Sequence, residues 1–425
     1  MSSSLVQRHE KVYAPVITWD SDIEVVSAEG AWVTDVEGEK YLDFACGISV
    51  VNAGHNHPAI VAAARDQLER VWHAGGAFRY DSLVTAAEKV LSVTPPSIRR
   101  LFFMNSGAEA VEASMKMARK VTGRQGIVTF RGGFHGRTMG SVTYTTSKAK
   151  YREGYHPLLP STFVTPFPHP FRWGMTEEQA TDHALMELEL KLKHEITPRE
   201  IAAFLIEPVQ GEGGYYPAPV RFLKRLRELS DEHGILLVFD EIQTGFGRTG
   251  KWFASEHYGL EPDVLVLGKA IANGLPLSAV AARDELLSAW PAGSHGTTFG
   301  GNPIACAAAA ATVDVLAGLL PGVPALSKHA FARFNEMKKK HSTIGDVRGL
   351  GLMIGIELVK GGNKPDPDAY TFLAAHAREH RLLILDCGPD GNVIRFIPPL
   401  SVTRAELDQG IDVIDGALTA YERRK

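Results

Sequence analysis

The chain has 425 residues, of which 44% are hydrophobic and 22% are charged, a composition typical of a globular protein. A chain of this length usually builds more than one hydrophobic core, so we expect two packed domains. The 45 basic and 49 acidic residues nearly balance, with a net charge of −4, which argues against nucleic acid or a membrane surface as a partner.

The first residues, MSSSLVQRHEKV, contain no apolar run of the kind found in secretory signals, which favours a cytoplasmic protein. The segment GHNHP places His55 and His57 close together with no third ligand in view, so we interpret it as a turn. The cysteines, Cys46, Cys306 and Cys387, are widely separated and form no CxxC motif. We therefore expect neither a disulfide framework nor a bound metal.

Residues 102–120, FFMNSGAEAVEASMKMARK, indicate a strand, a turn and a helix. Ser106 and Glu109 form an S-x-x-E capping box, and Gly107 permits a close approach of the backbone. The N-terminus of a helix offers free N–H groups and a partial positive charge, so this turn could hold a phosphate. Most capping boxes only cap their helix, so the motif needs support from other residues.

Short apolar runs alternate with helical stretches in the middle of the chain. The expected strands are residues 125–130, 201–207, 235–240 and 263–268. Each run is short, apolar and partly β-branched, as buried parallel strands tend to be. Between them, residues 220–234 have a helical pattern that ends at Gly234. This alternation predicts an α/β fold with a mainly parallel sheet.

The segment GFGRTGK (245–251) resembles nucleotide-binding motifs but does not meet their requirements. A P-loop needs Ser or Thr after its lysine, and this chain has Trp252 there. Both nucleotide motifs should also follow a strand directly, whereas residues 241–244 intervene here. A nucleotide-dependent protein is therefore the alternative from another functional class, and it predicts nucleotide binding without a chromophore.

The most apolar run, residues 304–320, is rich in alanine and contains Asp314. Asn302 and Pro303 precede it, where an N-cap and a first helical residue belong. These signals predict a packed helix rather than a membrane span.

The last hundred residues indicate a smaller α+β unit that begins near residue 320. The expected strands are residues 347–359, 382–388 and 392–400. A Gly/Pro-rich stretch at 361–368 separates the first two of them.

Three charged residues stand at the carboxyl ends of expected strands. Glu207 ends one strand, Asp240 ends the next, and Lys269 follows a third by two residues. The spacings are about 30 residues, which is one strand–helix–strand unit each. Ligands of open α/β sheets bind at this edge, so we expect the three side chains to face one crevice. A single charged residue at a strand end is usually only solvated, but three in register favour a site.

A lysine, an acid and a phosphate cradle are the groups that pyridoxal phosphate (PLP) requires. The lysine bonds covalently to the cofactor, and the acid keeps the pyridine nitrogen protonated so that the ring can accept electrons. We therefore predict a PLP enzyme in which Lys269 carries the cofactor and Asp240 faces the pyridine nitrogen.

The chain resembles the class III (ω-amino) aminotransferases, of PLP fold type I, along essentially its whole length. The matching segments are DFACGISVVNAGHNHP, NSGAEAVEASMKMAR, GGFHGRTMG, IEPVQGEGGYY, DEIQTGFGRTG, LGKAIANGLPL, GTTFGGNPIAC, VRGLGLMIGIEL and NVIRFIPPL. The resemblance implies a large domain with a mainly parallel sheet and a smaller α+β domain. The implied boundaries are 1–55 for an N-terminal segment that packs with the small domain, 56–320 for the large PLP-binding domain, and 321–425 for the small domain.

The resemblance also implies roles for residues around the cofactor. The implied catalytic residues are Lys269, Asp240 and Glu212. The implied cofactor-binding residues are Ser106, Gly107, Ala108, Phe134, His135, Glu207, Asp240, Ile242, Gln243, Lys269 and Thr298. Thr298 matches a threonine that reaches the phosphate of the neighbouring subunit, which implies at least a homodimer with shared sites.

The implied substrate-binding residues are Ile48, Arg137, Glu212 and Arg395. In such enzymes Arg395 would hold the α-carboxylate of 2-oxoglutarate, and Glu212 would shield it when the amino donor lacks that group. Ile48 favours 4-aminobutyrate as the donor, whereas MNSGAEA and HGTTFGGNP are closer to acetylornithine enzymes. An acetylornithine, ornithine or other ω-amine aminotransferase, or a racemase or aminomutase of the same fold, stays open as an alternative.

Overall fold

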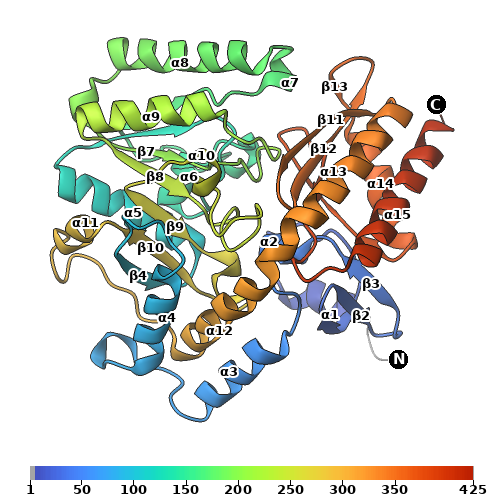
Figure 1. The fold of residues 1–425 in the computed structure, drawn as a ribbon, viewed down its shortest axis with the longest axis horizontal. Coiled ribbons are helices and arrows are strands. Elements are labelled where there is room, and N and C mark those ends of the chain that lie inside the picture. Colours follow the sequence, from blue (N-terminus) through green and yellow to red (C-terminus); the bar gives the residue numbers. More distant parts are fainter. Residues whose placement is uncertain (1–4, 425) are drawn as a thin grey trace.

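The computed structural model describes residues 5–424, and a seven-stranded sheet forms its centre (Figure 1). Its strand order is β4-β10-β9-β8-β7-β5-β6, and β10 is antiparallel to both of its neighbours while the remaining pairs are parallel. These strands are β4 (Arg100–Met104), β5 (Gly126–Phe130), β6 (Thr162–Thr165), β7 (Ile201–Ile206), β8 (Leu236–Asp240), β9 (Val264–Leu267) and β10 (Ser278–Ala282). The four strands expected here are confirmed, each within a residue or two.

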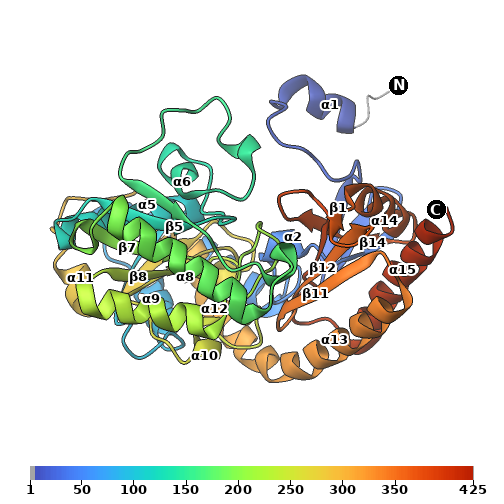
Figure 2. The same ribbon diagram turned by 90° about the horizontal axis from the view of Figure 1, so that it is seen from above.

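Helices cover both faces of this sheet, which is why its inner strands β5, β7, β8 and β9 are buried and mostly apolar. Figure 2 shows α8 (Glu177–His194) and α9 (Val220–His233) on one side, and α5 (Gly107–Thr122) and α6 (Met139–Tyr144) on the other. Successive residues of a strand face opposite sides. Phe204 and Ile206 accordingly join the core under α9, while Ala203 and Leu205 join the core under α5.

Two smaller sheets lie beside the large one. The first has the order β11-β12-β16-β15, with β13 added to β12, and the second has the order β1-β2-β3-β14. Their strands are β1 (Val25–Glu29), β2 (Trp32–Asp35), β3 (Lys40–Asp43), β11 (Ile344–Leu350), β12 (Met353–Lys360), β13 (Lys364–Pro365), β14 (Leu382–Leu383), β15 (Leu385–Cys387) and β16 (Val393–Phe396). Three helices pack with them: α13 (Val323–Lys340), α14 (Pro367–Glu379) and α15 (Arg404–Glu422). The parallel pairing of β3 with β14 joins the N-terminal strands to the C-terminal part of the chain.

Two of the expected strands near the C-terminus are wrong, because each is divided into two separate strands in the structure. Residues 347–359 are not one strand, because β11 and β12 form an antiparallel hairpin that turns at Gly351, where φ is +60°. Residues 382–388 are divided between β14 and β15, which belong to different sheets. An apolar run shows that a segment is buried, but not where it turns from one sheet to another.

The alanine-rich helix is a packed helix, as its sequence predicts. Within residues 5–424, one helical stretch, Pro303–Lys340, is long and apolar enough to cross a membrane by length and composition. It contains two helices, α12 (Pro303–Leu319) and α13, and α12 lies against α3 (Pro58–Leu68) and α4 (Asp81–Leu91) with one face buried. Asn302 caps α12 by accepting hydrogen bonds from the backbone of Ile304 at 3.0 Å and Ala305 at 3.3 Å.

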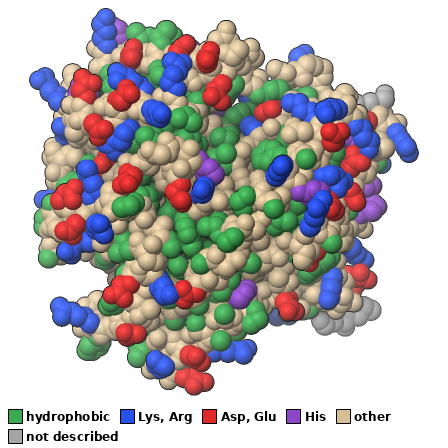
Figure 3. All heavy atoms as spheres, viewed as in Figure 1, with side chains coloured by type: hydrophobic (Ala, Val, Ile, Leu, Met, Phe, Trp, Pro, Cys, Tyr) green, Lys and Arg blue, Asp and Glu red, His purple; other side chains and the backbone are tan. Residues whose placement is uncertain are grey.

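The remaining helices are short or peripheral. They are α1 (Leu5–Val12), α2 (Cys46–Ser49), α7 (Pro170–Trp173), α10 (Ser255–Tyr258) and α11 (Asp284–Ser288). Figure 3 shows acidic and basic side chains intermixed on one face of the molecule, with hydrophobic side chains gathered across its middle. The division of the chain at residues 55 and 320 stays a prediction.

Candidate active site

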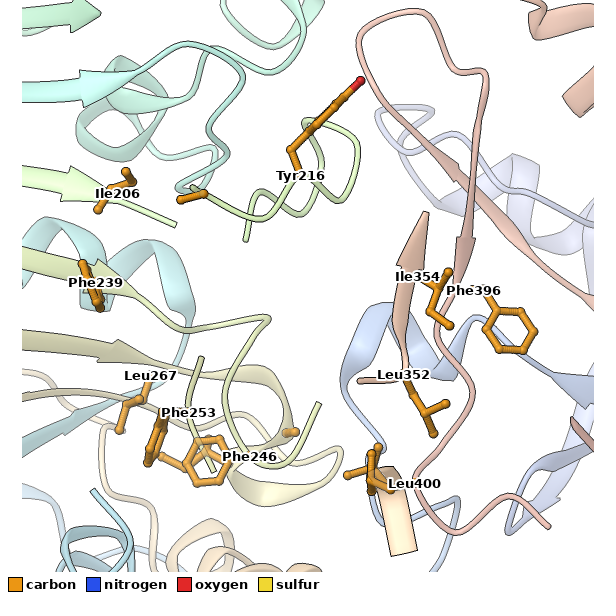
Figure 4. Packing of buried hydrophobic residues seen from close by; sticks show 14 of the residues in the cluster. Ile206, Tyr216, Phe239, Phe246, Phe253, Leu267, Leu352, Ile354, Phe396 and Leu400 are labelled. Carbon is orange, nitrogen blue, oxygen red and sulfur yellow. The ribbon is translucent and has the colours of Figure 1, made fainter. Parts of the chain in front are cut away.

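Three neighbouring parallel strands bring Glu207, Asp240 and Lys269 to one edge of the central sheet. Figure 4 shows Ile206, Phe239 and Leu267 at the ends of β7, β8 and β9, directly before this edge. Ile206 is paired with Phe239, and Asp240 is paired with Val266, so the strand ends are in register. The apolar strands thus place two acids and an amine side by side at the boundary of the core.

Asp240 and His135 form a buried pair at the centre of this edge. Nδ1 of His135 lies 2.7 Å from Oδ2 of Asp240, and both residues are almost fully buried. The other carboxylate oxygen accepts the backbone N–H of Ile242 at 3.1 Å. Burial works to lower the pKa of His135, but the hydrogen bond to Asp240 and the charges of Asp240 and Glu207 outweigh it and raise that pKa. The raised pKa favours a proton on His135, next to the Asp240 carboxyl group.

Glu207 fixes two loops with its two oxygens. Oε2 accepts the backbone N–H of Phe134 and Oε1 accepts that of Gly211, each at 2.9 Å. Burial raises the pKa of Glu207, as does the charge of Asp240, while His135 works in the opposite direction. Glu207 thus positions the segments on either side of the crevice.

Lys269 has a strained backbone and an unpaired amine. Its φ is +47°, a left-handed conformation that lysine rarely adopts, at the start of a short 3-10 helix (Lys269–Ala272). Burial lowers the pKa of the Lys269 amine, and the charges of Asp240 and Glu207 oppose that shift. Among residues 5–424 its Nζ has no hydrogen-bond or ion-pair partner. A lowered pKa and the lack of a partner both suit a nucleophilic amine.

The first turn of α5 has the expected capping box. The Ser106 hydroxyl accepts the N–H of Glu109 at 3.2 Å, and the Glu109 carboxylate accepts the N–H of Ser106 at 2.9 Å. A Cβ added to Gly107 would lie 2.8 Å from Cδ1 of Ile242, so a side chain at this position would collide with its neighbour. Ala108 follows as the next residue of the turn. The free N–H groups of this turn are available to an anion.

Gln243 directs a buried acceptor into the same space. Its Oε1 is buried and has no hydrogen-bond partner among the described residues. A Cβ added to Gly211 would lie 2.7 Å from that atom, so glycine leaves the amide its room. A buried polar atom without a partner is costly, which suggests that a ligand supplies the missing hydrogen bond.

Aromatic rings and a cation line the mouth of the crevice. The rings of Phe134 and Tyr151 meet edge to face with centroids 5.7 Å apart. The guanidinium of Arg137 lies 4.4 Å from the centroid of the Tyr151 ring and 5.8 Å from that of Phe134. Within the described part of the chain, Arg137 is exposed and has no ion-pair partner. Its charge is thus available to a carboxylate from solution.

Glu212 and Arg395 form a buried ion pair with further partners. Oε2 of Glu212 contacts the guanidinium of Arg395, and Oε1 accepts from the Tyr151 hydroxyl at 2.9 Å and lies 3.0 Å from Nζ of Lys148. The backbone carbonyl of Asp386 accepts from Nε of Arg395 at 2.5 Å. Burial lowers the pKa of Arg395 to about 10, and the charges of Tyr151 and of nearby carboxylates work against that shift. The sequence predicts the pair of Glu212 and Arg395, but no sequence motif indicated Lys148 or Tyr151.

Ile48 belongs to a left-handed turn, α2. The φ angles of Cys46, Gly47, Ile48 and Ser49 lie between +51° and +64°, and the Ile48 side chain is 44% exposed. A β-branched residue in this conformation is strained. The turn is held by Arg248, which is fully buried and donates to Oγ of Ser49 at 3.0 Å. Arg248 is the arginine of GFGRTGK, so this segment has a structural role that the sequence did not indicate.

Thr298 lies at the surface of the protein. It lines a cavity of about 730 Å³ together with the exposed residues Met139 and Phe299 and residues near the start of α5. Oγ1 of its neighbour Thr297 accepts a hydrogen bond from the Asn105 side chain at 3.2 Å, next to the capping box. The exposed position leaves the Thr298 hydroxyl available to a second chain.

The residues at the crevice fit PLP in chemistry. An unpaired amine, a carboxyl group, an unpaired amide oxygen and a helix N-terminus correspond to the aldehyde, pyridine nitrogen, ring hydroxyl and phosphate of this cofactor. A nucleotide at GFGRTGK does not fit, because Phe246 and Arg248 of that segment are completely buried. The fold and the crevice together define a PLP-dependent enzyme of fold type I.

Comparison with known proteins gives the family. Residues 17–418 match the family aminotransferase class-III. A 5-aminovalerate aminotransferase of Pseudomonas putida is 41% identical over 419 residues, which are 97% of each chain. A 4-aminobutyrate aminotransferase of Escherichia coli is 38% identical over 419 residues, again 97% of each chain. An amine transaminase from an uncultivated Pseudomonas species, in a PLP-bound form, superposes with a TM-score of 0.89 at 30% identity, covering 96% of this chain and 98% of the other.

The chain belongs to the class III aminotransferases, so it is a PLP-dependent enzyme. The predictions of fold class, cofactor and enzyme type are confirmed. Relatives of about 40% identity include ω-aminotransferases of the 4-aminobutyrate and 5-aminovalerate type, which supports the predicted class of reaction but not a particular donor.

Proposed function

We propose that the protein transfers the amino group of an ω-amino acid to 2-oxoglutarate, with 4-aminobutyrate as the first candidate donor. The observation that carries this proposal is the buried pair of Glu212 and Arg395. An ω-amino acid bound through its amine carbon presents hydrogen towards Arg395, whereas 2-oxoglutarate presents a carboxylate. A glutamate that pairs with Arg395 in the first case and leaves it in the second lets one pocket serve both substrates.

The residues at the strand ends perform the proton transfers. PLP, when bound, supplies an electron sink for the charge that develops at the amine carbon. Lys269 then acts as base and acid, removing a proton from that carbon and returning one. Asp240, with its hydrogen bond from His135, would keep a proton on the pyridine nitrogen. The first turn of α5 would hold the phosphate through its N–H groups.

The two ends of the donor have different requirements. The exposed guanidinium of Arg137 binds the carboxylate of the ω-amino acid and stays over the Tyr151 ring. Ile48 offers an apolar surface, where a donor with an α-carboxylate would need a polar partner. 4-Aminobutyrate and 5-aminovalerate both have a carboxylate for Arg137 and no carboxylate on the amine carbon. 5-Aminovalerate is the substrate named for the Pseudomonas putida relative.

A donor panel with 2-oxoglutarate tests this function. The purified holoenzyme is incubated with 4-aminobutyrate, 5-aminovalerate, acetylornithine and ornithine, and glutamate formation is measured. We expect the two ω-amino acids without an α-amino group to give the fastest rates. Faster turnover of acetylornithine or ornithine would replace the proposed donor. Loss of optical activity from an amino acid without any 2-oxo acid would identify a racemase instead.

A further inference from the structure

The last turn of α14 and the residue after it bring two imidazoles and a carboxylate together on the protein surface. The ligand atoms of His376, Glu379 and His380 all lie within 4.8 Å of one another. Residues three and four positions apart share one face of a helix, which is why HAREH converges in this way. We infer that these three residues form a binding site for a divalent transition cation such as Zn²⁺.

A hydrogen bond of His380 leaves one of its ring nitrogens free for a metal. Nδ1 of His380 lies 2.8 Å from the backbone carbonyl of His376, which can only accept a hydrogen bond. The proton of a neutral His380 ring is therefore on Nδ1, and Nε2 keeps its lone pair for a ligand bond. The two rings are stacked with centroids 4.1 Å apart, so a rotation of the half-buried His376 or the exposed His380 side chain would bring both lone pairs onto one ion. The second histidine is thus oriented as metal-bound histidines usually are.

The donor set selects the class of cation. Two imidazole nitrogens and one carboxylate oxygen suit Zn²⁺, Cu²⁺ or Ni²⁺, whereas Mg²⁺ and Ca²⁺ prefer oxygen ligands alone. Glu379 and His380 are exposed and His376 is half-buried, so water can complete the coordination. The site therefore has the composition of a three-ligand zinc site with an open position.

Two acidic side chains lie beside the cluster. A cavity of about 540 Å³ between α14 and α15 is lined by both histidines and by Asp408 and Asp412. Oδ1 of Asp408 accepts from Arg333 and contacts His329, each at 2.6 Å, and Oδ1 of Asp412 accepts from Arg333 at 2.5 Å. A bound cation would hold the last turn of α14 beside α15, on the side of the molecule away from the central sheet (Figure 1). Figure 3 shows histidine side chains at the surface on that side.

Calorimetric titration of the PLP-loaded enzyme with Zn²⁺ tests the site. We expect one high-affinity ion per chain, and His376→Gln and His380→Gln should each weaken its binding by about tenfold or more. The matched control is His194→Gln, because His194 is also exposed at the end of a helix and next to a glutamate, but has Leu190 four residues before it. This control should leave the affinity unchanged.

Electron paramagnetic resonance with Cu²⁺ identifies the ligands independently of affinity. The wild-type spectrum should show coupling to two imidazole nitrogens, and each histidine variant should lose one of them. Transaminase activity with 4-aminobutyrate should be the same in all variants without metal, because the site is separate from the crevice. Zn²⁺ affinity that is equal in the wild type and in His380→Gln, or lost equally in His194→Gln, would overturn the proposal.

Discussion

Asp240 and Asp263 are both buried acids of the central sheet, but Asp240 pairs with a histidine and Asp263 with two arginines. Its carboxylate receives a hydrogen bond from His135 at 2.7 Å and another from the backbone of Ile242. Asp263, at the opposite edge of the sheet, is also buried but pairs with Arg227 at 3.0 Å and Arg283 at 3.1 Å. Each oxygen of Asp240 has one protein donor and can accept a second hydrogen bond from a ligand, whereas Asp263 pairs with two arginines.

We expect Asp240→Asn to keep PLP bound but to lose most turnover. The amide cannot hold a proton on the pyridine nitrogen, and a charge-assisted hydrogen bond of this kind contributes about 1.5–3 kcal/mol. That loss corresponds to roughly a tenfold to hundredfold fall in kcat. The control Asp263→Asn should lower thermal stability and leave kcat nearly unchanged. Normal kcat in Asp240→Asn would show that another residue faces the pyridine nitrogen.

Glu212→Ala should affect the two half-reactions in opposite directions. Without Glu212, the buried Arg395 has no carboxylate to neutralise it when an ω-amino acid is bound, so that half-reaction should slow. The half-reaction with 2-oxoglutarate should survive or show a higher affinity, because no ion pair must first be broken. Single-turnover absorbance changes measure each half separately. Equal losses in both would assign Glu212 a structural role and remove the proposed switch.

Lys148→Met should produce the reverse asymmetry. Oε1 of Glu212 contacts Lys148 and Tyr151, so Glu212 has partners to keep after it leaves Arg395. Without Lys148, Glu212 should pair more firmly with Arg395, so the KM for 2-oxoglutarate should rise. The KM for the ω-amine should change little. Lys150→Met is a matched control, because Lys150 is exposed and lies near the same Tyr151 ring without contacting Glu212. A KM for 2-oxoglutarate that is unchanged in Lys148→Met would exclude this role.

At the level of elements, the sequence predicts those parts of the site whose signal is local. The apolar runs of β7, β8 and β9, the capping box of α5 and the end of α9 at Gly234 each depend on neighbouring residues. The left-handed turn of α2 depends instead on hydrogen bonds from Arg248, about two hundred residues away. The same holds for Lys148 and Tyr151, which reach Glu212 from another loop. Such contacts leave no periodic pattern in the sequence.

Arg248 provides a test of how α2 is held. Its guanidinium donates to Oδ1 of Asn52 at 2.6 Å and to the carbonyls of Pro398 at 2.7 Å and Leu352 at 3.1 Å. Arg248→Met would leave these buried acceptors unpaired, at about 1–3 kcal/mol for each. We expect a lower midpoint of denaturant-induced unfolding and a raised KM for the donor, since Ile48 loses its support. Arg248→Lys should be intermediate, and an unchanged midpoint in Arg248→Met would contradict this account.

At the level of the whole molecule, contacts between distant segments fix the crevice. Glu357 on β12 is completely buried and pairs with Arg348 of the neighbouring β11 at 2.6 Å and with Arg172 of α7 at 2.5 Å. The Tyr216 hydroxyl donates to the same carboxylate at 2.8 Å. These contacts join the C-terminal sheet to loops of the central sheet. Arg395 belongs to the first sheet, and Lys269 follows strand β9 of the second. The distance between the two substrate-binding regions is thereby set by a buried polar cluster.

We predict that the active unit is a homodimer with shared sites, because Thr298, which matches the family's cross-subunit phosphate ligand, is exposed at a surface cavity beside the start of α5. Lys269→Ala subunits should be inactive, and Thr298→Ala subunits should bind PLP weakly because the phosphate loses one ligand. A heterodimer of the two contains one site with both Lys269 and Thr298 intact. After random exchange of equal amounts, about one quarter of all sites should be intact, so the mixture should be more active than either variant alone.

Gel filtration of the wild type should give the mass of a dimer or larger assembly. A fully active monomer, or a mixture no more active than the average of its components, would refute the shared site.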